Sequence, residues 1–358
     1  MDRLAKKLET IGNDPKVAAR AVGLRYCGHS NKGYFRKKMG SSFFYVDEYE
    51  NRVTCPELLE RFKKLVIPPA WTDVWISPYE NGHLQVTGVD ARGRRQYRYH
   101  QQWTQIRNQH KFYRLRAFAD ALPCIRKKLD ADLKRRGLPY EKVMALVIRL
   151  MELTHIRIGN DAYQKLYGSF GMTTLRDKHV SIKSTSITFE FTGKKGIAHK
   201  VKLQSPRLAR LVRRCKEIPG QELFQYYDEN GCRRTIGSAD VNNYLKECTG
   251  QDFTAKDFRA WAGTVHALCA FREVGDFGSE SECNKNIVKV IDLVAEKLGN
   301  TRSVCKKYYI HPTVMAAYTN RSLAKYQHRS SKRSGGLSPD EQTLVKILDN
   351  EKMAPVLT

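Results

Sequence analysis

Several cationic side chains and two adjacent tyrosines, spread over residues 157–309, could together break a phosphodiester bond without a metal ion. Negative charge builds on the non-bridging oxygens of the phosphate as the transition state forms. Arginine stabilises this charge well because its planar guanidinium makes bidentate contacts and stays charged. The reaction also needs a nucleophile and a proton donor for the departing sugar hydroxyl. In chain order the candidates are Arg157, Lys194, Lys256, Arg259 and the tyrosines 308 and 309.

Taken singly, the cationic candidates have ordinary structural explanations. Arg157 closes a strongly apolar helical run, where an arginine usually interacts with the helix dipole or with solvent. Lys194 is at the tip of a predicted hairpin, where a lysine is normally just solvated. Lys256 and Arg259 are i and i+3 and present two cations on one helix face, although Asp257 is also typical of a capped helix start.

The charge balance indicates a polyanionic partner. The 358 residues include 63 Lys and Arg against 37 Asp and Glu, a formal net charge of +26. Nucleic acid is the simplest partner that neutralises such a charge. The length predicts about two domains, and 41% hydrophobic residues suffice to give each a packed core.

Several other classes of protein lack support in the sequence. The first twenty residues contain no apolar core of a signal peptide, and the longest strongly apolar stretch, near 143–150, is far shorter than the ~18 residues of a membrane span. Nine cysteines are scattered singly, as is typical of reduced thiols. GxxxxGK[ST] and HExxH are both absent, so we expect no nucleotide cofactor and no metal. We expect a cytoplasmic protein, associated with the nucleoid if the source is bacterial.

The chain changes character near residue 100. Before it, short alternating or aromatic-rich runs and a helix near Pro56–Lys64 predict a small, mainly antiparallel β domain over 1–100. After it, apolar residues recur with a helical period, and the run from Glu141 to Arg157 is predicted as one helix. The fold class is therefore α+β, with a larger, mostly helical domain over 101–320.

Two segments interrupt the helical pattern. Ser186–Leu203 alternates apolar and polar residues around Gly193-Lys194-Lys195-Gly196, which predicts a β-hairpin with a doubly basic tip. Residues 321–358 begin with a basic stretch rich in Ser and Gly, which predicts a flexible basic tail, and continue into a short acidic amphipathic stretch from Ser338 to Asn350.

The order of these pieces resembles the type IB DNA topoisomerase family, in the short form found in poxviruses and bacteria. The resemblance covers about residues 20–320 and is carried by five motifs, IPPAWTDVWI from Ile67, GVDARGRRQYRYH from Gly88, FTGK from Phe191, TAKDFRAW from Thr254 and LGNTRSVCKKYYIHP from Leu298. It implies that Arg157, Arg259 and Asn300 donate to the scissile phosphate. It also implies that Lys194 is the general acid and Tyr309 the nucleophile.

Three positions have alternatives. Tyr308 is the other possible nucleophile, but the family spacing selects Tyr309, and Tyr308 lies i+4 from Val304, which fits a packing role. Lys195 is the alternative general acid, and Lys256 is expected to assist. Asn300 stands where many family members have His, so a histidine-based acid is not expected there.

The resemblance implies a transesterification without ATP or a metal ion. The tyrosine forms a 3′-phosphotyrosyl bond, the free strand swivels about the intact one, and the 5′ hydroxyl then attacks back. The family also implies a monomer that closes as a clamp around double-stranded DNA. In the N-terminal part, Gln96, Tyr97 and Tyr99 alternate with arginines and are expected to contact DNA. A solvated edge strand is the alternative for this segment.

Two other functions remain open. A tyrosine recombinase shares the Arg, Lys, KxxR and Tyr chemistry, although the IPPAW and GRRQYRY segments argue against it. A non-catalytic basic DNA-binding protein that keeps the fold is the second alternative.

Overall fold

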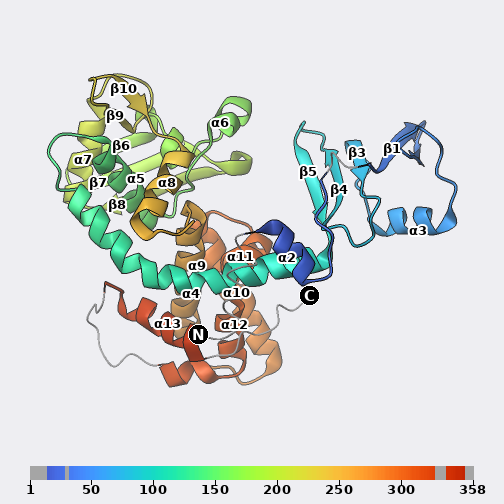
Figure 1. Ribbon diagram of the computed structural model, residues 1–358. Helices are drawn as coiled ribbons and strands as arrows, with labels where there is room; N and C mark the ends of the chain where they lie inside the picture. Colours follow the sequence, from blue (N-terminus) through green and yellow to red (C-terminus); the bar gives the residue numbers. More distant parts are fainter. Residues whose placement is uncertain (1–13, 29–31, 327–335, 351–358) are drawn as a thin grey trace. The chain divides into compact units, whose positions relative to one another are not determined.

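The computed structural model describes residues 14–28, 32–326 and 336–350 (Figure 1). The chain divides into two compact units, Met1–Tyr113 and Arg114–Leu357, and each is described separately below. The division falls inside helix α4 (Gln101–Asp132), and the domain boundary at residue 100 stays a prediction. An antiparallel sheet in the first unit and a mostly helical second unit confirm the α+β class.

The N-terminal unit is built on one antiparallel sheet of order β2-β1-β3-β4-β5. Helix α3 packs Phe62 against the sheet residues Val74, Ile76 and Val86. These four buried side chains form the hydrophobic cluster between the helix and the sheet. Proline in its first turn and basic residues in its last turn suit the two ends of this helix. The elements are α2 (Pro15–Ala21), β1 (Tyr34–Met39), β2 (Ser42–Val46), α3 (Pro56–Lys64), β3 (Thr72–Ile76), β4 (Leu84–Val89) and β5 (Arg95–Tyr99).

The C-terminal unit packs its helices around α5 and α9, which lie in one apolar core. Every residue of α5 from Lys142 to Ile148 is buried, so this helix runs through the interior. The elements after α4 are α5 (Tyr140–Thr154), α6 (Asp161–Tyr167), β6 (Val180–Lys183), β7 (Ser186–Thr192), β8 (Ala198–Gln204), α7 (Pro206–Lys216), β9 (Gln225–Tyr227), β10 (Arg233–Thr235), α8 (Ser238–Thr249), α9 (Ala255–Val274), α10 (Glu280–Leu298), α11 (Arg302–Tyr308), α12 (Pro312–Thr319) and α13 (Pro339–Asn350), with short 3₁₀ turns between some of them.

The predicted hairpin is confirmed as β7 and β8, which pair antiparallel from Ser186 with Gln204 to Thr192 with Ala198. Alternation buries Ile187, Phe189 and Phe191 against the core. The tip closes with a hydrogen bond from the Gly193 amide to the Ile197 carbonyl, at 2.7 Å. Lys195 adopts a left-handed conformation in this turn, with φ of 66°.

The prediction that one helix reaches Arg157 is wrong. Helix α5 ends at Thr154, and His155 is left-handed with φ of 56°. The carbonyl groups of Arg157 and Ile158 then accept hydrogen bonds from the Met172 and Thr173 amides, each at 2.7 Å. This pairing requires a non-helical backbone, so Arg157 lies beyond the helix rather than in its last turn.

The prediction of a flexible tail from residue 321 needs correction where the structure describes it. Ser322–Tyr326 forms a 3₁₀ helix, and α13 follows the expected amphipathic pattern but is packed. Its Leu344 and Ile347 side chains are fully buried in the same core as α5 and α9. Residues 327–335 and 351–358 lie outside the described residues.

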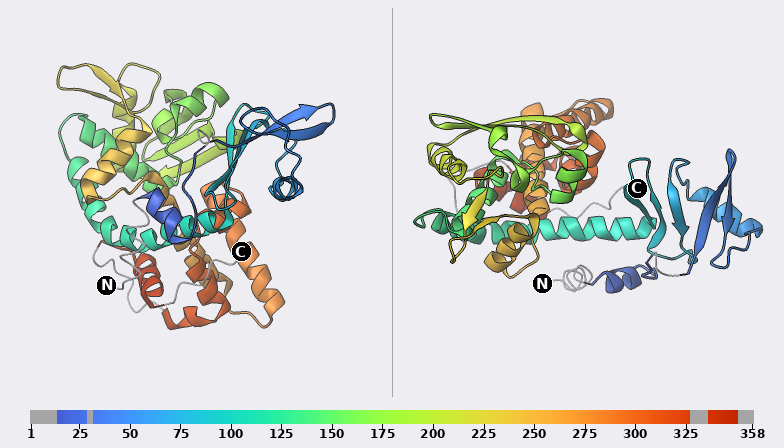
Figure 2. Two further views of the ribbon diagram at one scale, coloured as in Figure 1. Left: turned by 45° about the vertical axis from the view of Figure 1, so that its right-hand side comes forward. Right: turned by 90° about the horizontal axis from the view of Figure 1, so that it is seen from above.

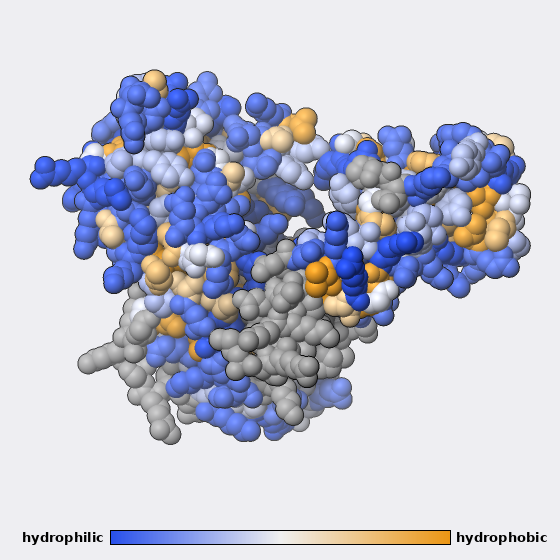
Figure 3. Space-filling view, viewed as in Figure 1, coloured by the Kyte–Doolittle hydropathy of each residue, from blue (hydrophilic) through white to orange (hydrophobic). Residues whose placement is uncertain are grey.

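Within the C-terminal unit, α13 and the three-stranded sheet lie on opposite sides of α4 in Figure 1 and in the left view of Figure 2. On the face shown in Figure 3, hydrophilic residues cover most of the surface and apolar residues form small patches. Among the described residues, no helix is long and apolar enough to cross a membrane.

Candidate active site

The turn at the end of α10 brings two of the predicted arginines together. Gly299 is left-handed with φ of 57°, which ends the helix and exposes its last carbonyl groups. Arg157 donates from Nη2 to the Gly299 carbonyl at 2.8 Å, and Arg259 donates from Nη2 to the Leu298 carbonyl at 2.8 Å. Arg259 also donates from Nη1 to the carbonyl of His155. Three separate segments, 155–157, α9 and the 298–300 turn, are therefore joined through two guanidinium groups.

Asn300 follows in the same turn and faces Arg157. Arg157 Nη2 donates to Asn300 Oδ1, and because a guanidinium only donates, the amide oxygen must point toward it. The Nδ2 atom of Asn300 is buried and has no hydrogen-bond partner among the described residues, and the same holds for Nε of Arg259. Buried donors without partners are costly, and they fit an acceptor such as a phosphate oxygen.

Tyr309 ends α11 beside these groups. The Arg259 guanidinium lies 5.2 Å from the centre of its ring, and the Thr264 hydroxyl of α9 donates to its carbonyl group at 3.2 Å. A Cβ atom on Gly263 would lie 2.5 Å from that carbonyl, so only glycine lets α9 approach the tyrosine backbone so closely. Tyr309 is half-buried against the core, whereas Tyr308 is 39% exposed, so the packing role expected for Tyr308 is wrong.

Lys194 lies at the hairpin tip and is coupled electrostatically to the residues of this cluster. The residue is exposed, but the protein around its ammonium group partly desolvates it, and this lowers the pKa of Lys194. The charge of Arg157 lowers the pKa further, with smaller effects from Lys195 and Lys256, while Tyr309 opposes the shift. These couplings place Lys194 near Arg157, Tyr309 and the exposed Lys256.

The cluster is strongly cationic and borders a cavity. Burial lowers the pKa of Arg157 first, and the charge of Arg259 lowers it further. Neither arginine forms an ion pair with a carboxylate among the described residues. A cavity of about 740 Å³ is lined in part by Arg157, Arg259, Asn300 and His199. Uncompensated cations that face a cavity favour an anionic ligand.

Comparison with known proteins matches two parts of the chain to described families, and the larger match contains the site. Residues 100–334 match the family described as eukaryotic DNA topoisomerase I, catalytic core, and residues 42–90 match bacterial DNA topoisomerase IB, N-terminal domain. The DNA topoisomerase 1B of Acanthamoeba polyphaga mimivirus is 30% identical over 309 residues, which cover 84% of this chain and 92% of that protein. The chain belongs to the type IB DNA topoisomerase family.

DNA topoisomerases of poxviruses are also similar in sequence to this type IB topoisomerase. The DNA topoisomerase 1B of Vaccinia virus is 26% identical over 277 residues, 75% of this chain and 83% of that protein. The DNA topoisomerase 1 of Rabbit fibroma virus is 28% identical over 278 residues, 74% and 82% of the two chains. The family resemblance drawn from the sequence motifs is confirmed, and all five predicted catalytic positions lie within residues 100–334.

The structure of this topoisomerase also shows neighbours of the site that the motifs did not indicate. His199 of β8 stacks on Phe191, with ring centres 5.1 Å apart, and lies against Gly299. Cys305 is fully buried on α11, and burial raises the pKa of its thiol to about 11. The sequence signal for His199 is its place on the second strand of the hairpin, just after the Lys194 turn.

A pair of histidines connects the C-terminal end of α5 to α9. His155 and His266 lie with their Nε2 atoms 2.9 Å apart, so one nitrogen donates and the other accepts. The pKa of His155 is lowered to about 3, chiefly by burial and further by electrostatic interaction with His266, Arg259 and Lys297. Burial and the charge of Lys297 lower the pKa of His266 to about 4. Both rings are therefore neutral near pH 7.

We expect this topoisomerase to lose stability as pH falls from about 6.5 toward about 4 because the unfolded state protonates these histidines first. Within that window each histidine contributes a slope of about 1.4 kcal/mol per pH unit to the free energy of unfolding. His266→Gln should reduce the dependence of the free energy of unfolding on pH by about the contribution of one histidine. Denaturant unfolding at a series of pH values measures this dependence. An unchanged dependence would contradict the lowered pKa of His266.

The three DNA-contact candidates of the N-terminal unit lie on β5, an edge strand of its sheet. Tyr97 and Tyr99 are 48% and 46% exposed, and their rings stack with centres 6.1 Å apart. Gln96 is on the other face, where its Nε2 donates to Asp90 at 2.9 Å. The tyrosines are thus presented to solvent as a pair, while the Gln96 amide is already engaged.

Proposed function

We propose that this enzyme relaxes supercoiled duplex DNA by cutting one strand through Tyr309, letting the strand rotate, and resealing it without ATP or a metal ion. The observation that supports this most is the meeting of Arg157, Arg259 and Asn300 at the 298–300 turn beside Tyr309, with unpartnered buried donors. Such a site suits a phosphate whose charge increases in the transition state.

The first chemical step is an attack of the Tyr309 oxygen on the scissile phosphorus. A bond forms between this oxygen and phosphorus while the bond from phosphorus to the 5′ oxygen breaks. The phenol loses its proton and the departing oxygen gains one, so the number of protons is unchanged. Resealing reverses each change, and the exchange of one phosphodiester for another is nearly balanced in energy, so that no ATP is required.

The roles proposed for the cationic residues follow from their surroundings. Arg157 and Arg259 are held by backbone carbonyl groups and need no reorganisation when charge develops on the phosphate. Asn300 donates from Nδ2, with a strength that does not vary with pH. Lys194 protonates the 5′ oxygen, for which its lowered pKa is favourable, and Lys256 adds positive charge near it. Lys195 remains the alternative acid.

Tyr97 and Tyr99 are proposed to contact bases of the duplex from β5, and a base contact from Gln96 requires its amide to leave Asp90. Tyr97→Ala combined with Tyr99→Ala should weaken duplex affinity about 5- to 50-fold, the loss expected for one or two base contacts. The salt dependence of binding should stay unchanged, because no charge is removed. Arg95→Gln on the same strand is the matched control and should reduce the salt slope by about one. Unchanged affinity of the tyrosine double variant would favour the solvated edge strand.

We also propose that the enzyme acts as a monomer and that both units bind the duplex as a clamp. Sedimentation of the enzyme on a duplex of defined length tests the stoichiometry. One chain per duplex is expected, and two chains on the shortest duplex that supports cleavage would contradict this.

Plasmid relaxation with covalent trapping tests the proposed function. The purified enzyme should relax positive and negative supercoils in EDTA without ATP, and detergent added during the reaction should trap protein joined to a 3′ DNA end. An adduct excludes a non-catalytic DNA-binding protein. Recombinant products from paired sites at a rate that matches relaxation would favour a tyrosine recombinase, and relaxation that requires a metal ion would contradict the proposal.

A further inference from the structure

Helix α13 lies outside the family match, which ends at residue 334, but it is part of the core of the C-terminal unit. Besides its buried Leu344 and Ile347, it forms polar contacts with α4 and α9. Asp349 accepts from Arg116 of α4 at 2.5 Å, and Asp340 accepts from Arg272 of α9 at 2.8 Å. A helix that lies beyond the matched residues thus contacts the helix that carries Lys256 and Arg259.

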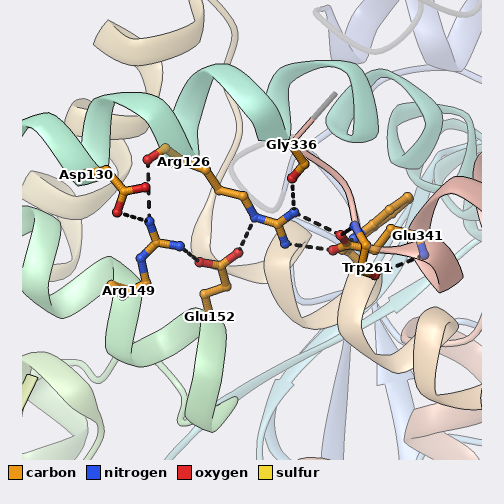
Figure 4. Close-up of polar contacts among 8 residues, drawn as sticks. Arg126, Asp130, Arg149, Glu152, Trp261, Gly336 and Glu341 are labelled. Carbon is orange, nitrogen blue, oxygen red and sulfur yellow. Dashed lines mark hydrogen bonds and ion pairs between the residues drawn. The ribbon is translucent and has the colours of Figure 1, made fainter. Parts of the chain in front are cut away.

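The centre of these contacts is the carboxylate of Glu341, whose side chain is 8% exposed (Figure 4). Arg126 of α4 donates to both of its oxygens, at 2.9 Å from Nη1 and 2.7 Å from Nη2. Trp261 of α9 donates from Nε1 at 2.9 Å, and the Ser338 amide donates at 2.7 Å. One carboxylate therefore accepts four hydrogen bonds from three segments.

Arg126 extends the network to α5. Its Nε donates to Glu152 at 2.7 Å, and Glu152 also accepts from Arg149 at 2.9 Å (Figure 4). Glu152 is five residues before Arg157 on the chain, and Trp261 is two residues after Arg259. The two segments that carry the candidate arginines are thus both tied to Glu341, one directly and one through Arg126.

The polar network borders a small cavity between α4, α5, α9 and the start of α13. A cavity of about 130 Å³ is lined in part by Arg126, Glu152, Trp261, Glu341 and the pair His155 and His266. Where close packing is incomplete, directional hydrogen bonds set the spacing of the helices. The polar network and the histidine pair therefore hold α5 and α9 at the level of the candidate arginines.

We propose that Glu341 is a positioning residue that holds α5 and α9 in the arrangement that aims Arg157 and Arg259 at one phosphate. This inference rests on the proposed function for the identity of the reacting groups. Glu341 itself does not touch DNA in this proposal. Its loss should slow cleavage and resealing while leaving the DNA affinity unchanged, because phosphate contacts over the rest of the surface remain.

Glu341→Gln is the main test, because the amide keeps the size of the side chain but places an N–H group against donors. Cleavage and resealing rate constants of the full-length enzyme should fall about 10- to 100-fold, the effect of small displacements of reacting groups. Duplex affinity should stay within about twofold. Asp349→Asn is the matched control, because it removes an exposed carboxylate of the same helix, and its rates should stay within about twofold of the unaltered enzyme.

Trp261→Phe is the second test if Glu341→Gln does not fold. It removes the indole N–H donor together with part of a buried ring, so its melting temperature is measured beside its rates. It should slow cleavage about 3- to 10-fold with unchanged affinity. Rates of Glu341→Gln, or of Trp261→Phe in its place, within twofold of the unaltered enzyme would overturn the inference. Equal losses of rate and affinity with a lowered melting temperature would also overturn it, in favour of a purely structural role. If the unaltered enzyme forms no covalent adduct, the proposed function fails instead.

Discussion

Tyr309→Phe is expected to abolish DNA relaxation, with a loss of at least about 10⁴-fold, because no other group of the cluster replaces the phenolic oxygen as nucleophile. The phenylalanine ring keeps the contact with the Arg259 guanidinium, which lies 5.2 Å from the ring centre in the native enzyme. The variant should therefore fold and bind duplex DNA within about threefold of the native affinity. Plasmid relaxation, adduct trapping and duplex titration measure the three properties.

Tyr308→Phe is the matched control, because this neighbouring tyrosine is exposed and lies one residue away. It should retain relaxation within about threefold. Full relaxation by the Tyr309 variant, or its loss in the Tyr308 variant alone, would assign the nucleophile to the other tyrosine.

Lys194→Ala is expected to slow strand cleavage by about 10²- to 10⁴-fold, the range of general acid catalysis, with little change in duplex affinity. Cleavage by the native enzyme should fall as pH rises through the pKa of Lys194, because the protonated form is the donor. Since the surroundings lower this pKa, the fall should come at a lower pH than for an ordinary lysine. Single-turnover cleavage over a range of pH measures it.

A substrate with sulfur in place of the bridging 5′ oxygen separates acid catalysis from binding. A thiolate leaves without prior protonation, since the pKa of a thiol is about 8.5. This substrate should restore most of the cleavage rate to Lys194→Ala. Lys195→Ala is the control and should stay close to the native rate on both substrates. The opposite pattern would make Lys195 the acid.

Much of the fold was predictable because local patterns agree with the tertiary structure. The alternation in 186–203 predicts the hairpin, and the proline and charge pattern of 56–64 predicts α3. The end of α5 was not predictable from the local sequence, because it depends on hydrogen bonds from residues 172 and 173 to residues 157 and 158. The donor residues lie well beyond the helical pattern along the chain. Composition also suggested a flexible tail where Leu344 and Ile347 join the core.

The candidate site was predictable as a set of residues but not as a geometry. The order of the motifs indicated Arg157, Lys194, Arg259, Asn300 and Tyr309, and the structure joins Arg157, Arg259 and Asn300 at the 298–300 turn beside Tyr309. The partners that hold them are mostly backbone carbonyl groups, such as those of His155, Leu298 and Gly299, and these carry no sequence signal. The contacts of Glu341 likewise connect residues far apart in sequence, with Arg126 more than two hundred positions away.

The most direct test of the account is to map the peptide that carries DNA after the covalent complex is trapped, digested with protease and nuclease, and sequenced by mass spectrometry. The account predicts a nucleotide joined through its 3′ phosphate to Tyr309. A nucleotide on Tyr308 or another residue, a 5′ linkage, or the absence of any linked peptide would contradict it.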